Sequence, residues 1–152
     1  MEKSINELPV VLDEGAKMPK RAHKWDAGLD FAANEGAVIP PHGWESVGTG
    51  VHVGIPQGTV GLLFPRSSMG FKRGLGFINS VGVIDSGYTG EVRACVHNHR
   101  GEPQRIKRGE RIAQLVVVPA ALLEPVLVET LGETERGDGC GYVSKTSSPS
   151  WE

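Results

Sequence analysis

The chain has 152 residues and a mass of 16.3 kDa, which fits one compact domain with a core of its own. Its 16 Lys and Arg against 18 Asp and Glu give a formal net charge of −2, which argues against non-specific binding to nucleic acid. No run approaches the ~20 apolar residues of a membrane span, and Cys95 and Cys140 lack paired spacing. We therefore expect a soluble, cytoplasmic protein without nucleic-acid or membrane partners.

The chain is punctuated by 21 glycines and 10 prolines, which separate short segments rich in Val and Ile. This pattern is typical of all-β proteins, and the economical architecture is a β-sandwich or a distorted barrel. No segment has sustained helical periodicity, so at most one helical turn is expected after Ser68. In chain order, strands are expected at Leu8 to Leu12, Ala37 to Ile39, Trp44 to Val53, Gly58 to Phe64, Gly82 to Ile84, Glu91 to Asn98, Gln104 to Ile106, Arg111 to Val118 and Pro125 to Glu129.

The C-terminal part of the sequence changes character twice. Leu115 to Val118 is apolar at consecutive positions, which indicates a strand buried on both faces, in the core or against another subunit. From Gly132 the chain is rich in Gly, Ser, Thr and charged residues, a composition typical of a mobile tail. We therefore expect a barrel over residues 1–131 and a tail over residues 132–152.

The segment from Asn79 to Glu91 places one carboxylate and one aromatic ring in a glycine-punctuated hairpin. Asp85 can orient a water or accept its proton, Tyr88 offers a flat face to a ring, and the Asn79 amide can read the edge of a base. Asp, Gly, Ser and Asn are also the residues of ordinary tight turns. The segment by itself favours the ordinary turn.

Three further sites carry groups suited to anions. After a predicted strand, Arg66 can grip phosphate oxygens in a bidentate manner, while Ser67 and Ser68 supply short directional donors. Gln114 lies inside an apolar run, so its amide either closes a structural network or faces a ligand. Arg136 to Ser144 combines an arginine with closely spaced glycines but lacks the ending of a Walker motif. A solvated turn explains the first of these sites at least as well, and a flexible tail is the preferred explanation of the last.

Cys95, His97 and His99 alternate along a predicted strand. Their side chains would share one face, as the ligands of a metal do. Neighbouring ligands would lie ~6–7 Å apart, too far for one zinc ion without ligands from other strands. A structural role is therefore preferred.

Taken together and in order, these segments resemble the trimeric dUTPase family, whose members split dUTP into dUMP and pyrophosphate. The resemblance covers nearly the whole chain and implies a jelly-roll-like β-barrel in a homotrimer. The active sites would lie at subunit junctions, and the tail of one subunit would close a site formed by others. The five motifs are Ala27 to Phe31, Pro65 to Ser68, Asn79 to Glu91, Gly109 to Gln114 and Arg136 to Ser144.

The resemblance also implies a role for each site residue. Asp85 would activate the attacking water, and Tyr88 would pack under the deoxyribose and exclude a 2′-hydroxyl. Asp30 would act through waters of a Mg²⁺ ion held mainly by the triphosphate, with no direct protein ligand. Uracil would be read by Asn79, Gly82, Val83 and Ile84. The phosphates would be held by Arg66, Ser67, Ser68 and the catalytic Gln114, and the tail residues Arg136, Tyr142 and Ser144 would close over the γ-phosphate and the base. Such an enzyme limits uracil in DNA and supplies dUMP for thymidylate synthesis.

Two departures from the family pattern leave alternatives open. Gly87 stands where the family more often has a second Asp, and the hairpin is also similar to that of the dCTP deaminases. In those enzymes a Glu lies five residues after the last hairpin glycine, whereas this chain has Cys95. One additional residue before Tyr142 leaves the register of the tail uncertain. A non-catalytic module that binds a nucleotide or a protein is the third alternative.

Overall fold

The computed structural model describes residues 7–132, which form an all-β fold with one short helix. Its elements in chain order are β1 (Val10–Leu12), β2 (Leu29–Ala32), β3 (Ala37–Ile39), β4 (Trp44–Val53), β5 (Thr59–Pro65), α1 (Ser67–Arg73), β6 (Leu75–Phe77), β7 (Gly82–Ile84), β8 (Glu91–Asn98), β9 (Gln104–Ile106) and β10 (Arg111–Pro119).

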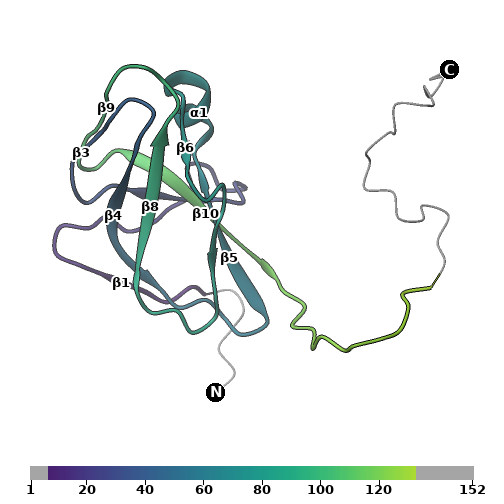
Figure 1. The fold of residues 1–152 in the computed structure, drawn as a ribbon. Helices are drawn as coiled ribbons and strands as arrows, with labels where there is room; N and C mark the ends of the chain where they lie inside the picture. The colour runs from purple at the N-terminus through teal and green to yellow at the C-terminus, as the bar shows by residue number, and fades with distance from the viewer. Residues whose placement is uncertain (1–6, 133–152) are drawn as a thin grey trace, which may run out of the picture. The chain divides into compact units, whose positions relative to one another are not determined.

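Two four-stranded sheets make up the barrel. Their strand orders are β1-β4-β8-β6 and β2-β10-β5-β7, and β3 and β9 form a separate two-stranded sheet. All the pairs are antiparallel. Figure 1 shows β4 and β8 running side by side, with α1 at the top of the view beside β6. The predicted all-β class is therefore confirmed.

The core lies between the sheets and follows from the alternation of side chains along each strand. In β8, Val92, Ala94 and Val96 are buried, whereas the intervening Arg93 is exposed. The buried side chains of both sheets belong to one apolar cluster, which includes Phe31, Val47, Val51, Leu63, Ile112 and Leu115. Because the core fixes which face of each strand is outward, it also fixes which side chains can meet a ligand.

Strand β10 lies between β2 and β5. Leu115 is fully buried, but Val116 to Val118 are only half-buried. The predicted burial on both faces is therefore met by Leu115 and only in part by the valines that follow it.

Several elements differ from those predicted. No strand forms at Pro125 to Glu129 within the single chain, and β2 and β6 were not predicted. Both missed strands are short, and in β2 the charged residue Asp30 interrupts the apolar ones. The helical turn expected after Ser68 is a helix of 7 residues from Ser67. It ends at Gly74, whose φ of 64° and N–H bond to the Gly70 carbonyl form a left-handed cap.

The chain divides into two units, Met1–Leu122 and Leu123–Glu152. In the described part of the second unit no helix or strand forms, and Leu123, Val126 and Leu127 expose most of their side chains. The predicted mobile tail lies outside the described residues from 133 onward, and the predicted division after residue 131 stays a prediction. No helix among residues 7–132 is long and apolar enough to cross a membrane.

Candidate functional site

The hairpin between β7 and β8 begins in the second sheet and reverses in a tight turn. Gly82 pairs with Leu63 and Ile84 with Gly61 of β5. The Tyr88 N–H then donates to the Asp85 carbonyl at 3.1 Å. Gly87 has a φ of 102°, a conformation that other residues rarely adopt. The glycine that departs from the family pattern therefore has a conformational reason in this turn.

A groove of about 240 Å³ opens along this hairpin. Strands β5, β7 and β8 supply its walls, and the polar groups come from the loop before β7 and from the start of β8. The lining residues are Leu63, Asn79, Gly82, Val83, Ile84, Tyr88, Glu91, Val92 and Arg93. The groove thus brings together all five residues predicted to recognise the base and the sugar.

The position of Tyr88 in this groove is set by its neighbours. Its hydroxyl donates to the Glu91 carbonyl at 3.0 Å, and the side chain is 48% exposed. A Cβ on Gly90 would lie 2.4 Å from the Tyr88 hydroxyl, so the ring can lie across this position only because residue 90 is glycine. The ring is therefore fixed at its outer end and open to a ligand.

Asp85 and Asn79 keep their polar groups available. Asp85 is exposed, and neither side chain has a hydrogen-bond partner among residues 7–132. Asn79 precedes Ser80, which has a φ of 62°, and its carbonyl accepts the Val81 N–H at 2.6 Å. The backbone is thus fixed where the two polar side chains are free to bind.

A second group of polar residues gathers where β2, β5 and β10 lie together. The Asp30 carboxylate is 10% exposed and accepts from Arg66 Nε at 3.0 Å and from Arg111 Nη1 at 2.9 Å. One carboxylate between two guanidinium groups leaves the group with a net positive charge. We call Asp30, Arg66, Arg111 and the adjacent Gln114 the phosphate cluster, after the role that the sequence predicts for Arg66 and Gln114.

Gln114 joins this cluster through the register of the sheet. It pairs with Asp30 of β2 on one side and with Phe64 of β5 on the other. Its Nε2 lies 3.4 Å from the Pro65 carbonyl, and a Cβ on Gly28 would lie 2.6 Å from its Oε1. Gly28 therefore leaves the space that the Gln114 amide occupies.

Ser67 and Ser68 form the first turn of α1, directly after Arg66. Ser67 is exposed and Ser68 is half-buried. Neither hydroxyl has a hydrogen-bond partner among the described residues. Both are available as donors beside the phosphate cluster.

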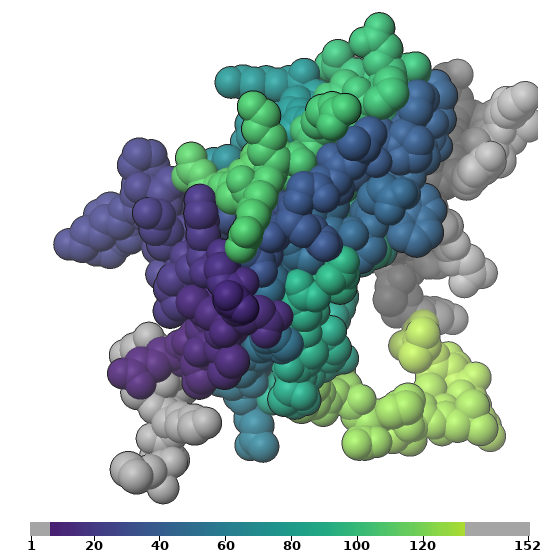
Figure 2. Space-filling view, turned by 90° about the vertical axis from the view of Figure 1, so that its left-hand side faces the viewer, coloured from purple at the N-terminus to yellow at the C-terminus, as the bar shows by residue number. Residues whose placement is uncertain are grey.

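The loop that leads into β2 is braced by its own turn. The His23 N–H donates to the Asp26 carboxylate and Arg21 Nε to the Asp26 carbonyl, each at 2.8 Å. Figure 2 shows this loop (indigo) standing out from the barrel. Trp25 is 87% exposed, with Lys24 Nζ 4.8 Å from its ring centroid. The loop delivers Asp30 to the cluster and leaves a cation and an aromatic ring in solvent.

Within one chain the groove and the phosphate cluster lie apart. Ile84, next to Asp85, pairs with Gly61, whereas Gln114 contacts Pro65 at the other end of β5. Four residues of strand separate these points by roughly 13 Å, and Asp85 lies further along in the same direction. None of the cluster residues lines the groove. A single chain therefore does not bring Asp85 to the same phosphate as Arg66.

Sequence reasoning gave no role to several residues of these sites. Arg111 was included in the fourth motif and Glu91 in the third without a role, and Arg93 was assigned only to a strand. Their signal is the outward alternation of charged residues in β8 and at the start of β10. The predicted tail residues Arg136, Tyr142 and Ser144 lie outside the described part of the chain.

The described residues offer no cage for a metal. Among residues 7–132 no group of three or more His, Cys, Asp and Glu side chains is arranged to hold an ion. The His97 and His99 rings lie 4.4 Å apart, and Cys95 is a free, half-buried thiol. Asp30 gives two of its lone pairs to arginines, and a carboxylate has about four. It can still accept a bond from a metal-bound water.

The sheets, the groove and the cationic cluster define an all-β protein with separate sites suited to a ring and to an anion. A sequence profile of the dUTPase family matches residues 14–144, and the chain belongs to this family. The deoxyuridine 5′-triphosphate nucleotidohydrolase of Corynebacterium glutamicum is 46% identical over 140 residues, covering 91% of this chain and 94% of the relative. That of Mycobacterium marinum is 46% identical over 141 residues, covering 88% and 92%.

Solved structures of dUTPases are also similar to this chain. The dUTPase of Staphylococcus bacteriophage 80alpha with dUpNHpp has a TM-score of 0.81 at 34% identity, covering 88% of this chain and 95% of the phage chain. A mutant dUTPase from phage phi11 of S. aureus, described with a structural Mg(II) ion, has a TM-score of 0.75 at 34% identity, with 83% and 99% covered. The predicted family is thereby confirmed.

Proposed function

We propose that this protein hydrolyses dUTP to dUMP and pyrophosphate. The observation that carries the proposal is the groove, which joins Asn79, the β7 backbone and Tyr88. Beside it lies Asp85, which is exposed and has no hydrogen-bond partner among residues 7–132. The relatives named for this activity and the phage structure with a dUTP analogue support it. The product dUMP would supply thymidylate synthesis, and the removal of dUTP would limit uracil in DNA.

The groove selects the base by matching hydrogen-bonding groups. Asn79 and the backbone of Gly82, Val83 and Ile84 face the N3–H and carbonyls of uracil. Cytosine would leave these groups mispaired, and the methyl of thymine would meet the wall of a narrow groove. Tyr88 lies under the deoxyribose, where its fixed ring leaves no room for a 2′-hydroxyl.

Asp85 acts as the general base. It takes a proton from a water as the water oxygen bonds to the α-phosphorus, and the bond from this phosphorus to the bridging oxygen breaks. Pyrophosphate leaves with the electron pair of that bond. No covalent intermediate with the protein is needed.

The phosphate cluster binds the chain of phosphates. Arg66 and Arg111 offer positive charge that Asp30 holds in place, and Gln114 with Ser67 and Ser68 supplies neutral donors. The chemistry that Mg²⁺ would supply, when bound to the triphosphate, is neutralisation of the charge that develops on the phosphate oxygens. Asp30 would accept a hydrogen bond from one of the waters of this ion, which fits its remaining lone pairs.

In a homotrimer the groove and the phosphate cluster of different copies would lie together. The groove of one copy and the phosphate cluster of another would face the same dUTP at a subunit junction. The exposed apolar side chains of Leu123, Val126 and Leu127 support association, because a monomer would leave them in water. Arg136, Tyr142 and Ser144 of a tail would close over the nucleotide.

A nucleotide panel tests the function. Purified protein with Mg²⁺ should release dUMP from dUTP and leave dCTP and dTTP intact, as read by chromatography. Release of dUTP from dCTP would instead identify a deaminase. Two observations argue against that reaction: Cys95 does not line the groove, and the Glu91 carboxylate accepts hydrogen bonds from Gly50 and Arg93. Binding of dUTP without turnover would identify a regulatory module.

Truncation before Arg136 tests the role of the tail. The shortened protein should fold like the full chain and lose most of its dUTP turnover, because the tail is polar by composition. Circular dichroism and the turnover assay give the two readouts. Full turnover without the tail would remove Arg136, Tyr142 and Ser144 from the site.

A further inference from the structure

Strand β4 contains a bulge that two carboxylates hold from outside. Its register against β8 shifts between Gly48 and His52, and Gly50 has a φ of 64°. The Gly48 N–H donates to Glu35 Oε1 at 2.7 Å, and the Gly50 N–H donates to Glu91 Oε1 at 2.8 Å. The carboxylates thus accept backbone N–H groups of the bulged segment.

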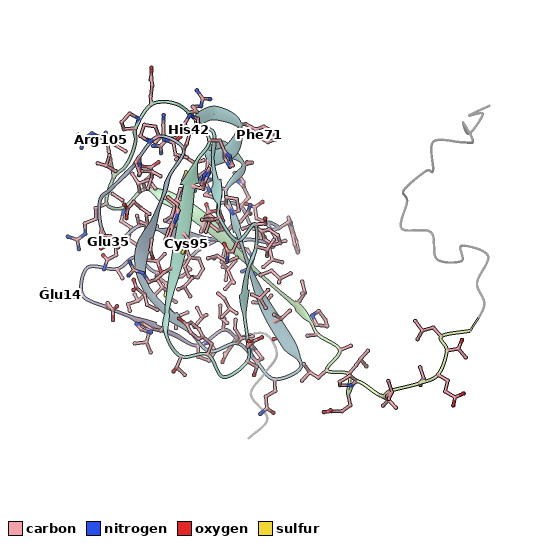
Figure 3. All side chains as sticks on the ribbon, viewed as in Figure 1. Glu14, Glu35, His42, Phe71, Cys95 and Arg105 are labelled. Atoms are coloured by element: carbon pink, nitrogen blue, oxygen red, sulfur yellow. The ribbon has the colours of Figure 1, made fainter. Side chains whose placement is uncertain are left out.

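Arg93 connects these two carboxylates. Its guanidinium donates to Glu91 Oε2 at 2.6 Å, to Glu35 Oε1 at 3.0 Å and to Ser46 Oγ at 2.9 Å. Figure 3 shows Glu35 beside β4, which it reaches from the loop between β2 and β3. The hydrogen bond that Arg93 donates to Glu91 raises the pKa of Arg93 further above its ordinary value, so Arg93 stays charged. We call Glu35, Glu91 and Arg93 the bulge clip.

A side chain at residue 48 would force the clip to shift. A Cβ on Gly48 would lie 2.5 Å from Glu91 Oε1 and 2.8 Å from Arg93 Nη1. The clip therefore lies directly on the backbone of β4, and its side chains have a defined position. This position is shared with the groove, because Glu91 and Arg93 both line it.

The clip reaches the sugar side of the groove through one residue. Glu91 gives its carboxylate to Arg93 and to Gly50, and its carbonyl accepts the Tyr88 hydroxyl at 3.0 Å. A shift of Glu91 would move the acceptor that fixes the outer end of the Tyr88 ring. The placement of this ring thus depends on the contacts that Arg93 makes with Glu91 and with Ser46 of β4.

We propose that Arg93, acting through Glu91, is a positioning residue that sets the discrimination between deoxyribose and ribose by holding the Tyr88 ring in place. This inference rests on the proposed function, in which Tyr88 excludes the 2′-hydroxyl. Arg93 takes no part in the attack on phosphorus. Its loss should therefore alter the choice of sugar and the binding of substrate, and spare the chemical step at Asp85.

Steady-state kinetics with dUTP and UTP test this role in the full-length protein. Arg93→Ala should lower the ratio of kcat/KM for dUTP over UTP by about tenfold, chiefly through KM, with little change in kcat for dUTP. Arg93→Lys keeps the charge beside Glu91 but loses the fork toward Ser46 and Glu35, so it should restore part of the ratio. Arg105→Ala is the matched control, because Arg105 is an exposed strand arginine outside the groove (Figure 3), and it should leave the ratio unchanged.

A second variant covers the case in which Arg93→Ala does not fold. Glu35→Gln keeps an acceptor for the Gly48 N–H, weakens only the contact with Arg93, and should lower the same ratio by a smaller factor. A lower Tm in folded Arg93 and Glu35 variants with an unchanged ratio would show a purely structural clip and overturn the inference. Wild-type protein that does not hydrolyse dUTP would instead refute the proposed function, and the inference with it.

Discussion

The groove at the β7–β8 hairpin and the phosphate cluster around Asp30 are built in opposite ways. In the groove the backbone is fixed by turns, while Asn79 and Asp85 have no partner among the described residues. In the cluster the charges are already paired, with Asp30 holding Arg66 and Arg111. The difference fits the two tasks proposed for these sites, because unpaired groups on a rigid frame suit the recognition of a base and preorganised charge suits the binding of phosphates.

The largest expected effect is that of Asp85→Asn in the groove. The amide keeps the shape of the turn but cannot accept the proton of the water, so kcat should fall by about 10²–10⁴-fold. Nucleotide binding and oligomer size should stay close to wild type, as measured by calorimetry and light scattering. Ser86→Ala, in the same exposed turn, is the control, and full activity in Asp85→Asn would remove the assigned base.

A smaller effect is expected from Arg66→Lys in the phosphate cluster. Lysine keeps the charge beside Asp30 but lacks the planar fork, so kcat/KM for dUTP should fall by about tenfold, mostly through weaker binding. The ratio of dUTP to UTP should not change, which separates this variant from Arg93→Ala. Arg73→Lys, an arginine paired with Glu110 outside the cluster, should leave the kinetics unchanged. An unchanged KM in Arg66→Lys would argue that the cluster is structural.

The turn beside Asp85 gives a moderate effect on stability. Gly87→Ala forces a Cβ into a φ of 102° where no atom lies within 4 Å, so strain without a clash is expected. The free energy of unfolding in urea should fall by about 1 kcal/mol. Gly58→Ala, at a φ of 76° and also in open space, is the matched control and should cost as much stability but leave turnover intact.

The smallest effect concerns pH and the outer end of the hairpin. His52 Nδ1 lies 2.9 Å from the Thr89 carbonyl and Nε2 lies 3.3 Å from Asp13. The hydrogen bond with the Thr89 carbonyl is the largest cause that raises the pKa of His52. Desolvation lowers this pKa by less, and the Asp13 and Glu91 carboxylates raise it further. A raised folded-state pKa stabilises fully below the unfolded value of about 6.5, and this stabilisation is lost as pH rises through the folded value.

Thermal unfolding of the wild type and of His52→Gln measures this contribution. The difference in Tm between them should be larger at about pH 5.5 than at about pH 8.5. His42→Gln, an exposed histidine whose side chain has no hydrogen bond among residues 7–132, is the control. An equal difference at both pH values would show that the ring acts by packing alone.

Most of the barrel was predictable because turn residues separate its short segments rich in Val and Ile. β4 and β8 were expected at their observed bounds, and β10 within one residue. The strand expected at Pro125 to Glu129 is wrong for the single chain. An apolar pattern indicates that a segment favours burial, but it does not show which strand would pair with it. β2 was not predicted because Asp30 interrupts its apolar residues. The pairing of Asp30 is visible only in the structure, where Arg66 and Arg111 lie beside it.

The sequence motifs indicate candidate site residues one by one but not how these residues assemble. The motifs indicated Asn79, Tyr88, Asp85 and Arg66, yet no sequence pattern shows that Asp85 and Arg66 lie at opposite ends of β5. The bulge clip was invisible for the same reason, because Glu35 and Arg93 are far apart in the chain and meet only over Gly48. The proposed cytoplasmic location and the roles of the tail residues stay predictions.

The central claim is that one active site takes its groove from one copy and its phosphate cluster from another. Mixing Asp85→Asn with an inactive Arg66→Ala variant, by refolding the two together in equal amounts, tests it directly. Random assortment restores about one junction in four, so dUTP turnover should rise to roughly a quarter of the wild-type value. Turnover no higher than that of the separate variants would show that both parts of the site lie in one chain, and would contradict the account.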